Sequence, residues 1–254
     1  MPCASGTSYE DAINEADKWM KTQAVLHDPD QIAGGSPFNL KGLGDKNINS
    51  SIGVQWCYRI DDLEKQIKRK GNNIMSMFND FMEESQFDEE TKRKIINVFP
   101  AELSDILIKY GSGSFLNGYL RIVNPFEYHE VIADTYFDAE NSVPFMTTAF
   151  GDVIVYKKDG YIGIIKYKDN DCGIIGKKIP LFLRFLEDTG FRKINFDIPL
   201  YDEAIEKYGK LKYEECFGFV PLLPMGGKKD VAHLEKVNEK VHIELITQLL
   251  GKIE

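Results

Sequence analysis

The chain has 254 residues with a net charge of −9, and 43% of its residues are hydrophobic and 28% charged. This length allows one large domain or two small ones, and the composition excludes a globally disordered chain. The acidic excess argues against a free-standing DNA-binding protein, which needs lysine and arginine to neutralise phosphates. No apolar run reaches the roughly 18–20 residues of a membrane span. No secretory signal is visible. We therefore expect a cytoplasmic protein that contacts neither nucleic acid nor membrane directly.

The charge is divided unevenly along the chain. Residues 1–70 sum to −1, and the rest of the chain sums to −8. At the seam, a basic patch ending at Lys70 is followed by Gly71-Asn72-Asn73, a composition typical of a linker. We therefore predict a first unit over residues 1–70, a linker over 71–74 and a second unit from residue 75 onward.

The first unit combines one helical pattern with a long loop-like segment. Apolar residues at helical spacing predict a helix over residues 9–26. Residues 27–53 are rich in Gly, Pro, Asn, Asp and Ser and read as a loop. Residues 54–60 fit a short strand or the start of a helix, and residues 61–70 fit a surface helix.

The second unit alternates helix and strand signals. Apolar spacing and N-terminal Asp or Pro residues predict helices at 78–82, 88–98, 100–110, 125–136, 180–188, 200–208 and 230–250. Apolar runs rich in β-branched residues predict strands at 119–123, 152–156, 161–167 and 172–179. Asp159-Gly160 joins the second and third of these strands as a hairpin. The fold class is therefore α+β, with a small, mostly antiparallel sheet surrounded by helices.

Two further expectations concern single segments of the second unit. In the last helix, a buried stripe is expected at positions spaced three and four apart: Leu234, Val237, Val241, Leu245 and Leu249. Gly111-Ser112-Gly113 follows a predicted helix and reads as a helix stop and tight turn.

His27 and Asp30 are the sharpest candidates for chemistry. A His and an Asp three residues apart can share a metal ion or activate a water molecule. The alternative is a turn through Asp28-Pro29 into Gly34-Gly35, and the spacing alone favours the turn.

No other segment carries a convincing motif. Gly226-Gly227-Lys228-Lys229 lacks the first glycine and the Ser/Thr of a P-loop. The remaining histidines have no zinc-site spacing, and the four cysteines form no CxxC pair. The second unit thus shows no catalytic set, and we expect neither a metal nor a cofactor.

Residues 27–60 resemble a family of bacterial toxins. The strings HDPDQIAGGSP and NSSIGVQWCYRI are similar to the C-terminal part of the HxxD-type DNase toxins that type VI secretion delivers. The resemblance maps the HxxD pair to His27 and Asp30, and the AGG string to Ala33, Gly34 and Gly35. It implies that only the C-terminal portion of such a polymorphic-toxin domain is present.

Residues 75–254 resemble the immunity family that neutralises such DNases. The strings that carry this resemblance are FPAEL, YGSGSFLNGYLRIVNPFEY, TTAFGDVIVY and CFGFVPLLPMGG. The resemblance implies a GAD-like domain over residues 75–200 and an immunity C-terminal domain over residues 201–254.

We therefore expect an immunity protein that binds an HxxD-type DNase and carries a fused, inactive toxin fragment. One alternative is an active metal-dependent DNase that uses His27 and Asp30. Another is a regulatory or structural module that binds a different protein. The acidic second unit favours the first hypothesis, because an acidic partner can compete for the DNA-binding surface of a nuclease.

The first unit is also expected to dock onto the second. At about 70 residues its own core is marginal. Exposure of its large apolar side chains would leave a patch of the kind that soluble monomers avoid. The side chains expected at this interdomain contact are Trp19, Phe38, Trp56 and Ile60.

Overall fold

The structure is a computed structural model that describes residues 18–27, 40–46 and 77–254. The chain divides into two compact units, Met1–Lys65 and Gln66–Glu254. Each unit is described by itself. Among the described residues, no helix is long and apolar enough to cross a membrane.

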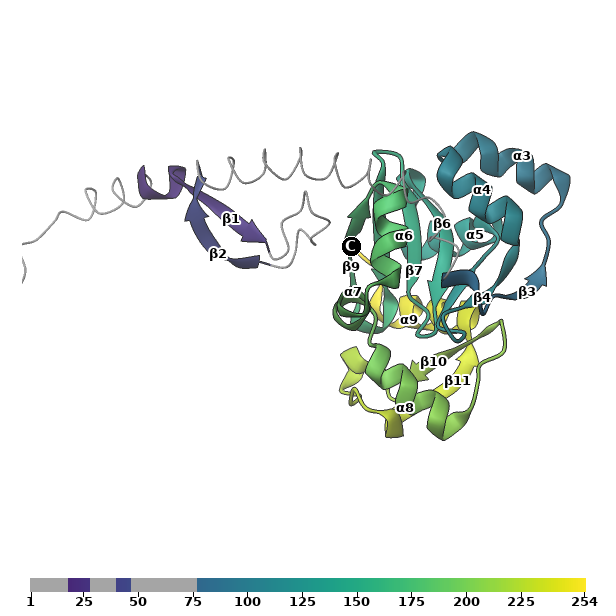
Figure 1. The fold of residues 1–254 in the computed structure, drawn as a ribbon. Helices are drawn as coiled ribbons and strands as arrows, with labels where there is room; N and C mark the ends of the chain where they lie inside the picture. Colours follow the sequence, from purple (N-terminus) through teal and green to yellow (C-terminus); the bar gives the residue numbers. More distant parts are fainter. Residues whose placement is uncertain (1–17, 28–39, 47–76) are drawn as a thin grey trace, which may run out of the picture. The chain divides into compact units, whose positions relative to one another are not determined.

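The described part of the first unit is a two-stranded antiparallel sheet (Figure 1). Strand β1 (Gln23–His27) pairs with β2 (Leu40–Asp45), and a helical turn at residues 18–21 precedes β1. The predicted helix over residues 9–26 is confirmed at residues 18–21 but wrong over residues 23–26, and the predicted loop over residues 27–53 is wrong at His27 and over Leu40–Asp45. Pairing with a distant strand overrides the local helical spacing. The elements predicted over residues 54–70 lie outside the described residues.

The second unit is built on a seven-stranded antiparallel sheet in which each strand pairs with the next described one along the chain. The predicted strands at 119–123, 152–156, 161–167 and 172–179 are all confirmed. The Asp159-Gly160 hairpin joins β7 to β8, and Gly160 has a positive φ of 84°. The strands are β3 (Met82–Ser85), β4 (Ser112–Phe115), β5 (Leu120–Ile122), β6 (Ser142–Thr148), β7 (Val153–Lys157), β8 (Tyr161–Lys166) and β9 (Asp171–Lys177).

Helices cover both faces of this sheet, which confirms the α+β fold class. Alternation along β7 shows the two faces: Ile154 belongs to one buried core, whereas Val153 and Val155 belong to the other. Helices α4, α6 and α8 contribute to the first core, and α5 and α9 to the second. The helices are α3 (Glu89–Val98), α4 (Ala101–Tyr110), α5 (Pro125–Thr135), α6 (Ile179–Glu187), α7 (Thr189–Asn195), α8 (Ile198–Tyr208) and α9 (Glu239–Leu250).

Local capping explains where several helices begin. The Asp88 carboxylate accepts a hydrogen bond from the Thr91 backbone N–H at 2.7 Å and opens α3. The side chain of Asn124 caps α5 in the same way, ahead of Pro125 at the first helical position. The predicted helices at 88–98 and 125–136 are confirmed and begin at these caps, and the predicted helix at 100–110 is confirmed with Pro100 at its N-cap position and no side-chain cap.

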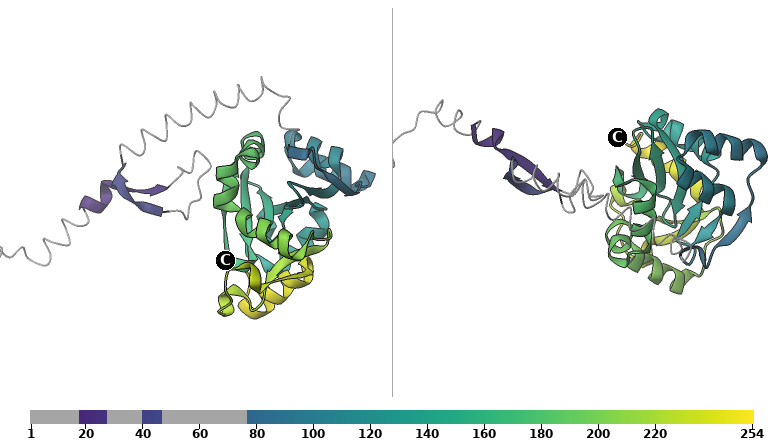
Figure 2. Two further views of the ribbon diagram at one scale, coloured as in Figure 1. Left: turned by 60° about the horizontal axis from the view of Figure 1, so that its bottom comes forward. Right: turned by 45° about the horizontal axis from the view of Figure 1, so that its top comes forward.

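A second, two-stranded sheet lies at one end of the large sheet, together with α8 (Figures 1 and 2). It consists of β10 (Glu215–Phe219) and β11 (Leu234–Asn238). The helix predicted over residues 230–250 is therefore wrong in its first part. Its N-terminal residues pair with β10, and Asn238 caps α9 by accepting a hydrogen bond from the Val241 N–H.

The predicted buried stripe of this last helix is also wrong. In α9, Val241 is 60% exposed, Leu245 45% and Leu249 56%, while Ile243 and Ile246 are buried. Both sets of apolar residues have helical spacing, so the pattern alone does not tell which face packs on the core.

The glycines that follow α4 enter a strand rather than a tight turn. Gly111 ends α4 with φ 66°, but Gly113 lies within β4. A Cβ atom at Gly113 would collide with the Phe81 ring and the Met82 carbonyl, so glycine lets β3 approach closely. The segment predicted as a helix at 78–82 instead leads into β3.

Candidate functional site

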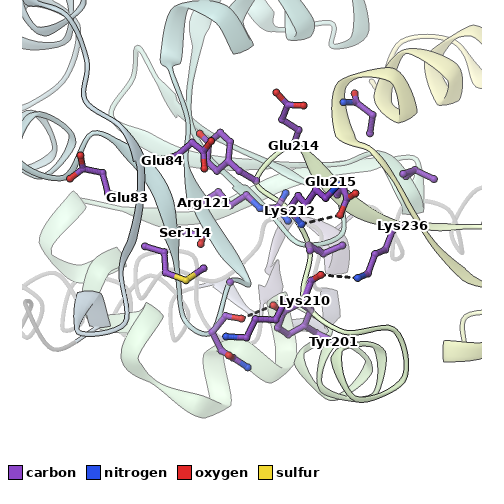
Figure 3. A pocket seen from close by; sticks show the side chains of 17 residues that line it. Glu83, Glu84, Ser114, Arg121, Tyr201, Lys210, Lys212, Glu214, Glu215 and Lys236 are labelled. Carbon is purple, nitrogen blue, oxygen red and sulfur yellow. Dashed lines mark hydrogen bonds between the residues drawn. The ribbon is translucent and has the colours of Figure 1, made fainter.

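A polar groove opens between the β3–β5 side of the large sheet and the strands of the small sheet (Figure 3). Its volume is about 690 Å³. The residues that line it are Met82, Glu83, Glu84, Ser114, Asn117, Gly118, Arg121, Tyr201, Lys210, Leu211, Lys212, Tyr213, Glu214, Glu215, Lys236, Val237 and Asn238. We refer to it as the Arg121 groove.

A buried ion pair forms part of the lining of the groove. Arg121, on β5, is 1% exposed, and its Nη1 donates to Glu239 Oε2 at 2.6 Å. Glu239 is the first residue of α9 and also accepts hydrogen bonds from the Tyr128 hydroxyl at 3.0 Å and the Thr147 hydroxyl at 3.4 Å. Burial raises the pKa of Glu239, while the Arg121 guanidinium opposes that rise.

One nitrogen donor of the Arg121 guanidinium has no hydrogen-bond acceptor among the described residues. The Nη2 atom of Arg121 is buried and makes no hydrogen bond with any of the described residues. A buried, charged donor without an acceptor is costly, because it has lost its water and gained nothing in return. In Figure 3, the Arg121 side chain reaches from β5 toward the middle of the groove.

The two sides of the groove differ in charge. Glu83 and Glu84 come from β3 and form one side in Figure 3, whereas the other side carries Lys210, Lys212 and Lys236 together with Glu214 and Glu215. Hydrogen bonds hold this mixed side: Lys236 Nζ donates to the Lys210 carbonyl at 2.7 Å, and the Lys212 N–H donates to Glu215 Oε2 at 2.9 Å. Such a surface suits a ligand or protein segment that carries charges of both signs.

Two tyrosines tie the rim of the groove to the large sheet. The Tyr201 hydroxyl donates to the Asn117 carbonyl at 2.7 Å, and the Tyr213 hydroxyl donates to the Ile122 carbonyl at 2.8 Å. The first bond ties α8 to the turn before β5, and the second ties the segment after α8 to β5 itself. The frame of the groove is therefore braced by hydrogen bonds.

A second hollow adjoins the Arg121 groove and shares Glu84, Tyr213, Glu214 and Asn238 with it. Its volume is about 460 Å³, and it runs toward Asp88 at the start of α3. The two hollows together form one continuous polar surface, because they share these four residues.

A second buried charge cluster lies away from the groove. Lys168 is buried, and its ammonium lies 3.0 Å from Asp152 Oδ2, 2.9 Å from Asp169 Oδ2 and 3.5 Å from Asp197 Oδ2. Lys229 joins the cluster 2.9 Å from Asp197. The three ammonium protons of Lys168 thus have carboxylate acceptors. A fully paired buried cluster of this kind has a structural role.

Most of the site residues predicted from the toxin-like strings lie outside the residues that the structure describes. His27 is the last residue of β1. Trp19 is 54% exposed in its helical turn. The other predicted residues lie outside the described residues: Asp30, Ala33, Gly34, Gly35, Phe38, Trp56 and Ile60. The structure therefore does not test the HxxD pair or the predicted interdomain contact.

The residues of the Arg121 groove were not predicted from the sequence. One signal was available: Arg121 interrupts an otherwise apolar strand, YLRIV, and a charge in such a position needs a buried partner. Its partner Glu239 lies 118 residues away, so no local pattern could have identified it. Among the described residues, no cluster of three or more His, Cys, Asp or Glu side chains could hold a metal ion.

Three family models match successive parts of the chain. Residues 3–80 match Novel toxin 15, residues 72–167 match the GAD-like domain, and residues 177–250 match the C-terminal domain of the type VI secretion (T6SS) immunity protein Tdi1. These matches confirm the resemblance found in the sequence. Residues 72–167 and 177–250 are thus similar to a GAD-like domain and to the C-terminal domain of a type VI secretion immunity protein, and residues 3–80 are similar to a toxin model.

The comparison with solved structures supports the fold. The crystal structure of Atu4351 from Agrobacterium tumefaciens superposes with a TM-score of 0.52 at 17% sequence identity. The match covers 67% of this chain and 86% of that chain. None of the curated proteins matches this chain.

Both charge clusters join the segment that matches the GAD-like model to the segment that matches the Tdi1 C-terminal model. Arg121 lies within the GAD-like match and Glu239 within the Tdi1 match. Asp152 lies within the first match, and Asp197 within the second. Because the buried cores are also shared between the two segments, they fold as one body.

Proposed function

We propose that this protein neutralises a DNase toxin of the HxxD class by binding it in the cytoplasm. The observation that carries the proposal is the paired match to the GAD-like and Tdi1 C-terminal models across residues 72–167 and 177–250. The charge supports it, because residues 71–254 carry a net charge of −8 and a DNase must present a basic surface to DNA.

The test is a binding and protection experiment with the full chain. The probe is a Novel toxin 15-type DNase domain whose HxxD histidine has been replaced, so that it can be produced safely. We expect a stable complex by calorimetry, and protection of cells that express the active toxin. The association rate should fall as salt rises, because surface charge steers the encounter. Failure to form a complex with any toxin of this class would remove the proposal.

The toxin-like segment belongs to a second proposal, namely that it is catalytically inactive. The HxxD pair consists of one histidine and one carboxylate, His27 and Asp30, with Asp28 between them, whereas a Mg²⁺ nuclease site usually needs several oxygen ligands arranged octahedrally. We expect no cleavage of plasmid DNA with Mg²⁺ or Mn²⁺.

The enzyme alternative keeps one supporting observation, the Novel toxin 15 match over residues 3–80. Plasmid cleavage that disappears in His27→Ala would establish a metal-dependent DNase and overturn the inactive-fragment proposal. The same assay with Asp30→Asn would show whether both members of the pair are needed.

A third proposal concerns the two units of the chain. We propose that residues 1–70 dock onto residues 75–254 as a captured toxin fragment, with Trp19, Phe38, Trp56 and Ile60 at the contact. The short linker would give the fragment a high effective concentration. Proteolysis at Gly71–Asn73 should leave two pieces that co-purify, and separation of the pieces on a sizing column would count against docking.

A further inference from the structure

The Arg121 groove combines features that a structural ion pair alone does not need. The guanidinium of Arg121 is a fork with two N–H edges, and Glu239 takes one of them at 2.6 Å. The second edge, Nη2, makes no hydrogen bond with the described residues although the side chain is 1% exposed. A carboxylate is the partner that fits this planar donor best.

The same groove also offers a place for a positive charge. Glu83 and Glu84 are exposed on β3, on the side opposite Lys210, Lys212 and Lys236 (Figure 3). These glutamates would repel a multiply charged anion such as phosphate, but they attract a lysine or arginine side chain. A ligand with a carboxylate and a cation some distance apart satisfies both sides at once.

The dimensions favour a peptide segment. A volume of about 690 Å³ holds a few residues, and the adjoining hollow extends the surface toward α3. The Arg121 groove has polar walls, with charged side chains from β3 and from the segment before β10. Because Nη2 is covered, a carboxylate reaches it only when a lining side chain moves, and the exposed lysines can move at small cost.

We propose that the Arg121 groove binds a zwitterionic peptide segment of the toxin partner. Its carboxylate binds Arg121 Nη2, and its basic side chain lies against Glu83 and Glu84. This inference rests on the proposed function, because it names the part of this protein that takes hold of the toxin. The same charge pattern would accept a free small zwitterion, and the experiment separates these two sources.

The experiment measures binding of two probes to the full chain by calorimetry. One probe is the Novel toxin 15-type DNase domain with its HxxD histidine replaced, and the other is the dipeptide lysylglutamate. Arg121→Lys keeps the charge beside Glu239 but removes the second donor edge, so toxin binding should weaken at least about tenfold. The double variant Glu83→Gln/Glu84→Gln should weaken it about threefold, since these side chains are exposed.

The matched control is Glu102→Gln/Glu140→Gln, which removes two exposed glutamates that do not line the groove. Its affinity should stay within about twofold of wild type. Circular dichroism and thermal melts check that Arg121→Lys is folded. If it is not, the exposed β3 double variant still decides the question. Competition by lysylglutamate against the toxin would place the toxin segment in the groove.

The remaining outcomes are equally decisive. Suppose that wild type binds the toxin, that the groove variants bind it equally well, and that lysylglutamate does not bind. The groove proposal is then wrong, while the immunity function stands. If wild type does not bind the toxin, the immunity function fails. Lysylglutamate binding that is lost in Arg121→Lys, with toxin binding unchanged or absent, assigns the groove to a free zwitterion and overturns the toxin-segment inference. No binding of either probe overturns the inference as well.

Discussion

The two buried charge clusters of the second unit differ in how completely their donors are used. Lys168 meets carboxylates from Asp152, Asp169 and Asp197, so its three protons all have acceptors. Arg121 binds Glu239 with one edge of its guanidinium and leaves Nη2 without a partner among the described residues. Both clusters link the GAD-like segment to the C-terminal segment, and of the two cations Arg121 is the one that lines the groove of about 690 Å³.

This difference separates a structural cluster from a candidate binding site. A fully paired buried charge contributes little net stability, but it becomes costly when one partner is removed. A buried donor without an acceptor raises the free energy of the folded state, and a ligand that supplies an acceptor removes this destabilisation. The Lys168 cluster should therefore respond mainly in stability, and the Arg121 cluster mainly in binding.

The largest expected effect is on stability, in Lys168→Met. The substitution leaves Asp152, whose side chain is 1% exposed, without its cation. We expect the free energy of unfolding to fall by about 3–5 kcal/mol, as for other buried pairs that lose one partner. Urea denaturation measures this loss. The exposed Lys158→Met should change stability by less than about 0.5 kcal/mol.

Lys168→Met also tests the comparison between the clusters. Under conditions where the variant remains folded, its affinity for the toxin domain should equal that of wild type. A loss of affinity similar to that expected for Arg121→Lys would mean that the two clusters do not have separate roles.

A smaller effect on stability is expected for Glu239→Gln. The amide oxygen can still accept from Arg121 Nη1, but the charge that balances the guanidinium is gone. We expect a loss of about 2 kcal/mol, in the range for hydrogen bonds to charged groups. Thermal melts should show that acetate restores part of this stability, because the anion can reach Arg121 through the groove.

The control for the acetate effect is Lys168→Met, which perturbs the other buried cluster and leaves the Arg121–Glu239 pair as in wild type. Its melting temperature should rise with acetate no more than that of wild type. If acetate stabilises wild type, Glu239→Gln and Lys168→Met equally, the groove gives no special access to Arg121.

The sequence predicted those elements that are specified by nearby residues. Asp88 and Pro100 mark the starts of α3 and α4, and Asp159-Gly160 marks the β7–β8 hairpin. These signals act within a few residues, so tertiary contacts rarely reverse them. The α+β class followed from them.

The elements and sites that the sequence did not predict depend on distant partners. β11 looks helical until it pairs with β10, and α9 then turns Ile243 inward and Val241 outward. The Arg121 groove likewise needs residues from β3, β5 and the segment before β10. No window of sequence contains all of them, although the arginine in YLRIV was a visible anomaly.

The smallest expected effect is the response of the Lys168 cluster to acid. Burial alone would raise the pKa of Asp169, but Lys168 and Lys229 outweigh it and lower the pKa below the usual value of 3.8. The unfolded chain therefore takes up this proton first, and the stabilisation from Asp169 is present above about pH 4 and lost as pH falls through the folded-state pKa. Because Asp169 is partly exposed, the contribution should be below about 1 kcal/mol.

Burial raises the pKa of Asp152, so Asp152 does not add to this acid loss. Urea denaturation between pH 3 and about pH 6 should show a shallower pH dependence for Asp169→Asn than for wild type. The exposed Asp105→Asn should keep the wild-type profile, and an Asp169→Asn profile identical to wild type would show that the cluster holds its charges without this carboxylate.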